Sequence, residues 1–281
     1  MRLQQMTEAI ARRLTAAGYQ PGEAATVARL LLSHQLSCPL SRLPLQHDAE
    51  IEIAAVEEKL ARLEQGEPVQ YLLGHTEFMG LNLLCGPEAL IPRGDSEPVV
   101  EATLGLLRGR HSPRIADICT GCGAYALAVA AFLPCCRVWA TDISAAALRL
   151  ARCNAARLNV APRVDFFCGD LLQPLSGLGL QFDLIISNPP YIASNDIDAL
   201  SPQVQCEPRL ALDGGPDGLD FYRRLANGAA ELLGAEGLLI VEHGAEQQEL
   251  LMRLFADQGW QLQQRIEDYG YRPRGLALRR G

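Results

Sequence analysis

Apolar and polar positions alternate with helical spacing over the first 65 residues. Within residues 3–14 the apolar side chains recur every three or four positions, so they share one face of a helix. Pro21 begins a second amphipathic helix, a proline-bearing loop follows over residues 38–44, and residues 48–65 predict a third helix. We expect the following side chains to face inward: Leu3, Met6, Ile10, Leu14, Val27, Leu30, Leu31, Ile53, Val56, Leu60 and Leu63. The pattern predicts a small helical bundle over residues 1–68.

The pattern changes over the next stretch of chain. Apolar runs there are broken by Gly74, Gly80 and Gly86, which is typical of a hairpin. We therefore expect a hairpin linker over residues 69–95, followed by a helix over residues 96–108.

The remaining chain, residues 96–281, alternates apolar strands with helices. The predicted strands are residues 114–119, 137–143, 163–168, 182–187, 237–244, 260–266 and 275–280, and the predicted helices lie near residues 124–133, 145–158, 217–233 and 246–257. Strands that are apolar throughout and separated by helices form a mostly parallel sheet with both faces covered. Ligands bind such α/β sheets beside the carboxyl ends of the strands, near the point where the strand order reverses. We therefore look for function in the loops that follow the strands.

Composition excludes several classes of protein. The 281 residues are 48% hydrophobic with a formal net charge of −8, so the chain is neither mainly disordered nor suited to holding duplex DNA with its whole surface. Nine cysteines are too few for a disulfide miniprotein of this length. Cys119, Cys136 and Cys168 sit in apolar stretches, as small buried hydrophobes do in a reducing compartment. With neither a signal peptide nor a membrane span in the pattern, we expect a cytoplasmic protein.

The loop after the first strand has the features of a cofactor site. Its sequence, residues 117–123, is Asp-Ile-Cys-Thr-Gly-Cys-Gly and it leads into a helix. A glycine-rich turn at this place lets a ligand approach the backbone and the helix N-terminus. Asp142 ends the second strand about twenty residues later, where a carboxylate can accept from both ribose hydroxyls of a nucleoside. Together these features predict a nucleoside-bearing cofactor.

Two carboxylates bear on the choice of cofactor. The run from Gly121 to Ala126 also fits a dinucleotide fingerprint. Asp117, however, lies inside the strand, where it can meet a cationic amino group, and Asp170 follows the third strand, where it can meet an adenine amino group. These positions favour S-adenosylmethionine.

Cys119 and Cys122 also form a CxxC pair at a helix start, where a redox dithiol would lie. The glycine loop between them is better explained by ligand binding. The second CxxC that a structural zinc site needs is missing, so we expect no metal.

The loop after the fourth strand carries the most specific signal. It reads Ser-Asn-Pro-Pro-Tyr-Ile over residues 187–192, and its prolines forbid regular structure. The Asn188 side-chain oxygen and the Pro189 carbonyl are two acceptors that can hold both N–H bonds of a planar amide or amino group, and Tyr191 can stack on it. The loop therefore predicts a substrate slot for a planar nitrogen.

The motifs DICTGCG and NPPY together resemble methyltransferases that act on planar nitrogens: adenine N6, guanine N2 or glutamine N5. The flanking segments 66–83, 91–101, 188–194 and 206–225 resemble the HemK/PrmC family of protein-glutamine N5-methyltransferases, which act on peptide-chain release factors. The resemblance covers residues 66–281. The helical part of this chain resembles the family in type only. The family carries a small N-terminal helical domain that contacts the release factor.

The resemblance implies a fold, a reaction and a set of site residues. The fold is a Rossmann-like class I S-adenosylmethionine-dependent methyltransferase sheet, and the reaction methylates the glutamine of a Gly-Gly-Gln motif. The implied cofactor residues are Asp117, Cys119, Thr120, Gly121, Cys122, Gly123, Asp142, Asp170, Leu171 and Asn188, and the implied substrate residues are Asn188, Pro189, Pro190 and Tyr191, of which Asn188, Pro189 and Tyr191 are the catalytic candidates. This chain departs from the family at three of these positions: Cys119 replaces a glycine, Cys122 a small residue, and Leu171 an aromatic residue.

A nucleic-acid N-methyltransferase is the alternative, because an NPPY loop also suits adenine. Such an enzyme must extract a base and hold a polyanion, which calls for a basic face or a target-recognition domain. The acidic balance and the short, mixed-charge N-terminal part favour a protein substrate instead. We expect a monomer whose partner is a release factor, with neither a membrane nor a stably bound nucleic acid. Because the motifs hold no strong base, catalysis is expected from orientation and electrostatics.

Overall fold

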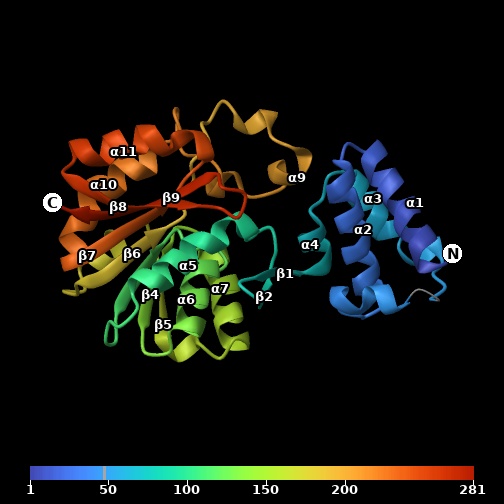
Figure 1. Ribbon diagram of the computed structural model, residues 1–281, viewed down its shortest axis with the longest axis horizontal. Coiled ribbons are helices and arrows are strands. Elements are labelled where there is room, and N and C mark those ends of the chain that lie inside the picture. The colour runs from blue at the N-terminus through green and yellow to red at the C-terminus, as the bar shows by residue number, and fades with distance from the viewer. Residues whose placement is uncertain (47–48) are drawn as a thin grey trace. The chain divides into compact units, whose positions relative to one another are not determined.

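The computed structural model describes residues 1–46 and 49–281, which divide into two compact units (Figure 1). Unit 1 comprises residues 1–74 and the separate segment 200–206, and unit 2 comprises residues 75–199 and 207–281. Across the described residues, no helix combines the length and apolar character that crossing a bilayer requires.

Unit 1 is helical around its own apolar core. Its helices are α1 (Leu3–Ala16), α2 (Pro21–Gln35), α3 (Glu57–Glu64), α4 (Val69–Leu73) and α9 (Pro202–Gln205), with 3₁₀ segments η1 (Leu40–Gln46) and η2 (Ile53–Ala55). The predicted inward stripe of α1 is confirmed, since the four residues predicted to face inward are all buried. Pro21 is the first residue of α2, where its missing N–H costs nothing. The segment predicted as a loop over residues 38–44 instead forms most of η1.

The third predicted helix is shorter than expected. Helix α3 begins at Glu57, whereas the prediction began at residue 48, which lies outside the described residues. Ile51 exchanges backbone hydrogen bonds with Met1 in both directions, each 2.9 Å long. Because these backbone groups pair across the unit, they are not available to a helix.

Unit 2 opens with the predicted hairpin, although within narrower limits. Strands β1 (His75–Phe78) and β2 (Leu81–Leu84) pair antiparallel. The stretch predicted as linker begins with helix α4, which starts directly after Pro68 and ends at Gly74 in the left-handed region. It closes with the 3₁₀ segment η3 (Gly94–Ser96).

The main sheet has seven strands in the order β5-β4-β3-β6-β7-β9-β8. They are β3 (Arg114–Ile118), β4 (Arg137–Asp142), β5 (Val164–Cys168), β6 (Phe182–Ser187), β7 (Leu233–Glu242), β8 (Trp260–Glu267) and β9 (Pro273–Arg280). The first five in this spatial order are parallel, and β9 runs antiparallel to both neighbours. The predicted mostly parallel α/β sheet is confirmed, and its strand order reverses between β3 and β6.

Helices cover both faces of this sheet (Figure 1). The longer ones are α5 (Glu97–Leu106), α6 (Ala124–Phe132), α7 (Ala145–Arg157), α10 (Asp220–Leu232) and α11 (Gln248–Asp257). One core packs α5, α6 and α7 against the sheet, and a second packs α10 and α11 against the opposite face. Short elements α8 (Gln173–Ser176), η4 (Ala161–Arg163), η5 (Ile197–Ala199), η6 (Arg209–Ala211) and η7 (Ala245–Gln247) connect them. The neighbouring β3 residues Ile115 and Ala116 contribute to opposite cores, so both faces of this strand are covered.

One of the three cysteines expected inside the protein is exposed. Cys136 is buried and Cys119 partly so, but Cys168 is exposed. Cys168 is the last residue of β5, the edge strand, and its thiol lies against the Ile143 carbonyl. An apolar run at a sheet edge therefore does not bury all of its residues.

Candidate active site

A pocket opens at the carboxyl ends of β3, β4 and β6, where the strand order reverses. Among its lining residues are Asp117, Cys119, Thr120, Gly121, Cys122, Asp142, Asp170, Leu171, Asn188 and Pro190. The structure thus brings together the expected cofactor residues except Gly123, which precedes the first residue of α6. Pro189 and Tyr191 do not line this pocket. Further lining residues that sequence reasoning missed include Phe78, Arg93, Ser96, Tyr125, Leu210 and Phe221.

The turn after β3 depends on left-handed backbone conformations. Gly121 has φ 56° and Gly123 has φ 90°, and Cys119 has φ 63° although it carries a side chain. A Cβ at Gly123 would lie 2.9 Å from Leu127 Cδ1 and 3.2 Å from Ala151 Cβ, so a larger residue would have to displace these side chains. A Cβ at Gly121 would meet one neighbour within 4 Å, Ala89 Cβ at 3.8 Å. Gly123 is therefore required by packing, whereas Gly121 leaves its space to the pocket.

Asp142 is tied to this turn by backbone hydrogen bonds. Its Oδ2 accepts from Gly121 N and its Oδ1 from Ser144 N, both at 2.8 Å. Burial nevertheless raises the pKa of this carboxyl. Each carboxylate oxygen has a second lone-pair site, so both can also accept from a ligand's hydroxyl groups.

Asp117 lies deeper, at 1% exposure. Its Oδ2 accepts from Thr120 Oγ1 at 2.6 Å and from Ala126 N at 3.0 Å, which leaves Oδ1 for a ligand. Burial raises the pKa of this carboxyl to about 7, against the lowering effect of these two hydrogen bonds. A cation bound beside it would favour the ionised form.

Asp170 and Leu171 follow β5 at the other side of the pocket. Asp170 Oδ2 forms an ion pair with Arg224 at 2.6 Å, and both side chains are about half exposed. Leu171 is buried with φ 48°, and its carbonyl accepts from Thr141 Oγ1 at 2.9 Å. Leu171 thus presents an apolar side chain to the pocket from a fixed backbone.

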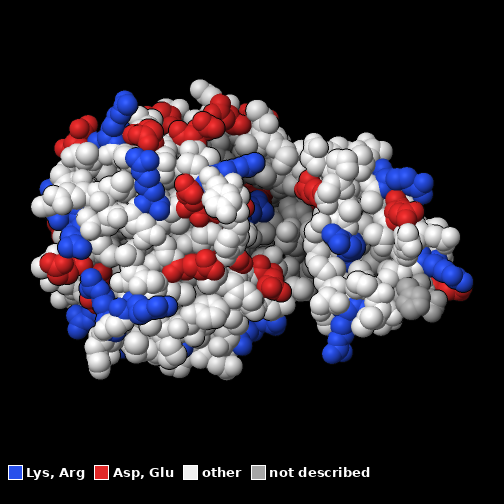
Figure 2. All heavy atoms as spheres, viewed as in Figure 1, with Lys and Arg blue, Asp and Glu red and all other residues white. Residues whose placement is uncertain are grey.

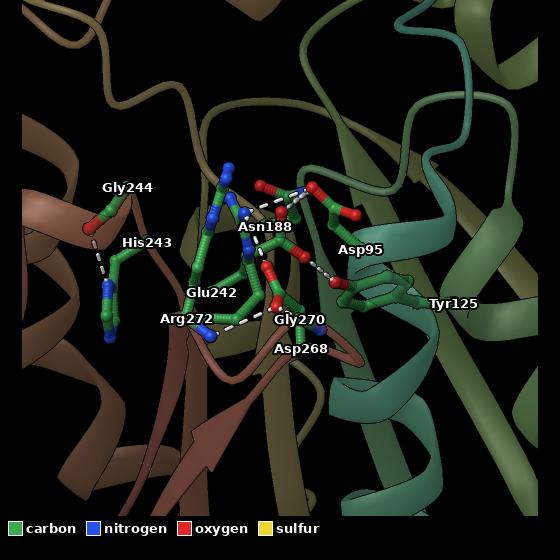
Figure 3. A network of polar contacts seen from close by, with 10 residues as sticks. Asp95, Tyr125, Asn188, Glu242, His243, Gly244, Asp268, Gly270 and Arg272 are labelled. Carbon is green, nitrogen blue, oxygen red and sulfur yellow. Dashed lines mark hydrogen bonds and ion pairs between the residues drawn. The ribbon is translucent and has the colours of Figure 1, made fainter. Parts of the chain in front are cut away.

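Asn188 directly follows β6 and contacts a carboxylate from the next strand. Its Nδ2 donates to Glu242 Oε1 at 2.9 Å, and the Tyr125 hydroxyl donates to Glu242 Oε2 (Figure 3). Glu242 is 3% exposed, and burial raises its pKa. Because Nδ2 is engaged, the oxygen of the Asn188 amide is the atom available to accept from a substrate.

The prolines and Tyr191 are packed against a glycine-rich segment. A Cβ at Gly214 would lie 2.8 Å from both the Pro190 carbonyl oxygen and Tyr191 Cα. Ile192 also forms an isolated parallel bridge with Asp213. Tyr191 is partly buried, its carbonyl accepts from Gln247 Nε2 at 2.9 Å, and burial raises its pKa. The loop is therefore held by contacts with residues 213–214 and with Gln247.

A second buried carboxylate joins two segments far apart in sequence. Glu207, 4% exposed, accepts from Ile91 N at 2.8 Å and forms an ion pair with Arg93. Arg93 lines the pocket, so this pair fixes one of its walls.

The cysteine pair of the turn does not have the properties of a redox dithiol. Burial raises the pKa of both the Cys119 and the Cys122 thiol. Reactive thiols have lowered pKa values, because the thiolate is the nucleophile.

On the face shown in Figure 2, acidic and basic side chains are interspersed over both units.

Comparisons with known proteins show which family this chain is similar to. The PrmC N-terminal domain model matches residues 5–74, and the Methyltransferase small domain model matches residues 101–204. A release factor glutamine methyltransferase of Moorella thermoacetica is 45% identical over all of this chain and 99% of its own length. One of Agrobacterium fabrum is 38% identical over 96% of this chain and 94% of its own.

Solved structures share the fold at low sequence identity. The hMettl16 catalytic domain in complex with an RNA hairpin has a TM-score of 0.57 at 16% identity, covering 73% of this chain and 76% of that one. A methyltransferase of Pyrococcus furiosus has a TM-score of 0.52 at 19% identity, covering 79% and 98%. The sequence matches are far more specific, and by them the chain belongs to the release factor glutamine methyltransferase family.

Proposed function

We propose that this chain transfers a methyl group from S-adenosylmethionine to the side-chain nitrogen N5 of a glutamine in a peptide-chain release factor. The observation that carries the proposal is the position of Asn188, whose amide reaches the same pocket as the carboxylates of the glycine turn. Family membership supports the same reaction.

The pocket residues fit the proposed cofactor. S-adenosylmethionine has an ammonium group, a ribose diol and an adenine, and when bound it supplies an electrophilic methyl group. Asp117 Oδ1 suits the ammonium group, Asp142 the two hydroxyls, and Asp170 with Leu171 the adenine. The open space beside Gly121 lets a ligand approach the backbone.

Substrate activation then falls to the loop after β6. A carboxamide nitrogen is a weak nucleophile, because its lone pair is delocalised into the carbonyl group. We assign the Asn188 oxygen and the Pro189 carbonyl to the two amide N–H bonds and Tyr191 to the face of the amide. Two acceptors orient the nitrogen and stabilise the positive charge that develops on it during attack. No residue need remove the proton beforehand: as the N–C bond forms, the S–C bond breaks to leave a neutral thioether, and the proton then passes from the methylated nitrogen to water.

The helical domain over residues 1–68 is assigned to recognition of the release factor. Its family model matches most of unit 1, and the pocket lining contains no described residue of that unit. We therefore expect unit 1 to affect binding of the intact protein substrate rather than the transfer step.

The test is a labelled-methyl transfer assay with intact release factor, followed by mass spectrometry to locate the methyl group. We expect one label on the glutamine of the Gly-Gly-Gln motif. Replacing that glutamine by asparagine withdraws the nitrogen by about 1.5 Å, one carbon–carbon step, and should cost on the order of a hundredfold in rate. Transfer to tRNA or duplex DNA, with none to the release factor, would contradict the proposal.

A further inference from the structure

We propose that Glu242 is a positioning residue whose carboxylate determines which end of the Asn188 amide faces the substrate. The inference rests on the proposed function and deepens it, because it concerns how the substrate acceptor is oriented. Glu242 lies 54 positions from Asn188 in sequence.

Sheet register places the two residues side by side. Strands β6 and β7 are parallel neighbours in which Ser187 pairs with Val241. Asn188 directly follows Ser187 and Glu242 directly follows Val241, and the Asn188 Nδ2 and Glu242 Oε1 atoms lie 2.9 Å apart. The contact therefore follows from the pairing of two central strands.

The chemistry of the contact sets the orientation of the amide. A carboxamide has a donor end and an acceptor end of nearly the same shape, and a half-turn about its bond exchanges them. A carboxylate only accepts hydrogen bonds. Beside Glu242 the stable orientation therefore points Nδ2 at the carboxylate and leaves Oδ1 to accept from the substrate nitrogen.

Glu242 is itself held in place from several sides (Figure 3). Tyr125 donates to its other oxygen. Tyr222 donates to its main-chain carbonyl at 2.8 Å. Burying a carboxylate is costly unless its oxygens are hydrogen-bonded, and here Tyr125 of α6 and Asn188, directly after β6, each donate to one of them. The amide is thus oriented by a rigid group rather than by solvent.

A series of variants separates orientation from fold stability. Glu242→Leu removes the acceptor and frees the amide to turn, so kcat should fall by about 100-fold while cofactor affinity changes less than about twofold. Glu242→Gln keeps one acceptor and should give an intermediate loss. Thr103→Val, which removes a buried hydrogen bond within α5 (Thr103 Oγ1 to the Val99 carbonyl, 2.8 Å), is the control for destabilisation and should keep kcat.

The decisive variant is Asn188→Asp combined with Glu242→Gln. It exchanges donor and acceptor in the same hydrogen bond, because glutamine now donates to aspartate, and the second aspartate oxygen still faces the substrate. Asn188→Asp alone sets two carboxylates against each other and should be nearly inactive. The double variant should exceed it in kcat by at least about tenfold, the effect of one restored charge-assisted hydrogen bond.

A readout independent of activity is the ¹H–¹⁵N signal of the Asn188 side-chain amide, assigned by its loss in Asn188→Asp. One of its protons should be shifted downfield in the wild type and return toward the free-amide value in Glu242→Leu. An unshifted signal in the wild type, kcat losses that follow unfolding free energy across all variants, or no rescue in the double variant would each overturn the positioning role. A shifted signal in a wild-type enzyme that leaves release factor unmethylated would instead contradict the proposed function alone.

Discussion

Strands β3 and β6 are neighbours in the sheet, yet the loops that follow them are stabilised in different ways. The backbone of the loop after β3 is shaped by glycines in left-handed conformations, and the Asp142 carboxylate at the end of β4 accepts from Gly121 N. The loop after β6 has stiff prolines, but its key side chain is oriented by Glu242 from another strand and its backbone is packed against Gly214.

The difference fits what each loop is proposed to hold. A cofactor with charged and hydroxyl groups can be bound by backbone turns and fixed carboxylates. A neutral amide must be met by the correct end of another amide, and that needs a partner which permits a single orientation. The first loop can therefore be recognised in a short stretch of sequence, whereas the second needs the sheet register.

Asn188→Ala should separate the roles of the two loops most clearly, because it should lower turnover and leave cofactor affinity unchanged. Losing one preorganised group at a reacting centre costs roughly 100- to 1000-fold in turnover, and the pocket's carboxylates remain intact. Single-turnover transfer and calorimetric cofactor binding measure the two properties separately. A comparable loss of cofactor affinity would show that the loops are not independent.

The opposite pattern is expected for Asp142→Ala. Two hydrogen bonds from the ligand's hydroxyls to a carboxylate are lost, together with those from Gly121 N and Ser144 N. Hydrogen bonds to charged groups contribute about 1.5–3 kcal/mol each, so cofactor affinity should fall by at least about tenfold in calorimetry. Unchanged affinity would remove Asp142 from the proposed cofactor site.

A matched pair of variants tests why each glycine is needed: Gly123 for packing within the fold and Gly121 for open space in the pocket. Gly123→Ala should lower the free energy of unfolding by about 2–3 kcal/mol, because left-handed strain adds to the contact with Leu127. Gly121→Ala should cost only about 1–2 kcal/mol, the strain alone, yet weaken cofactor binding. Chemical denaturation compares them, and equal losses of stability would contradict the packing argument.

Cofactor affinity should depend on pH through Asp117, whose pKa is raised to about 7 by burial. An ammonium group pairs with the ionised form, so affinity is full above pH 7 and falls by up to about tenfold per pH unit below it. For folding the sign is opposite: the folded state holds this proton more tightly than the unfolded state, so the group's contribution to stability rises as pH falls through 7. Titration calorimetry from pH 6 to 8.5 should show the affinity slope in the wild type and a flatter profile in Asp117→Asn.

The smallest effect is expected for the double variant Cys119→Gly, Cys122→Ser. Both thiols are protonated at neutral pH, and neither has a role in the proposed transfer. Glycine at position 119 also relieves a left-handed conformation, so stability should rise slightly or stay level. Transfer within about twofold of wild type is the expected result; abolished transfer would revive a thiol mechanism.

The strands and the turn after β3 were predictable because their signals are local. Apolar runs gave the sheet, and the spacing of Asp117, the glycines and Asp142 indicated a nucleoside site. Glu242 was missed because the sequence alone does not show that β7 pairs with β6. Only that pairing brings the carboxylate at the end of β7 next to Asn188. The helix predicted over residues 48–65 was too long for a similar reason, since Ile51 pairs with Met1 across the unit.

The segment 200–206 has a consequence for how the chain folds during synthesis. It belongs to unit 1, where the Cys206 thiol lies against the Gly66 carbonyl and a Cβ at Gly66 would be 2.7 Å from Pro202 Cβ. Residues 1–74 leave the ribosome well before this segment, so the helical unit cannot be completed until more than half of unit 2 has been translated. The order of domain folding is thus coupled to translation, and cutting the chain at residue 74 removes the helical unit without removing its last element.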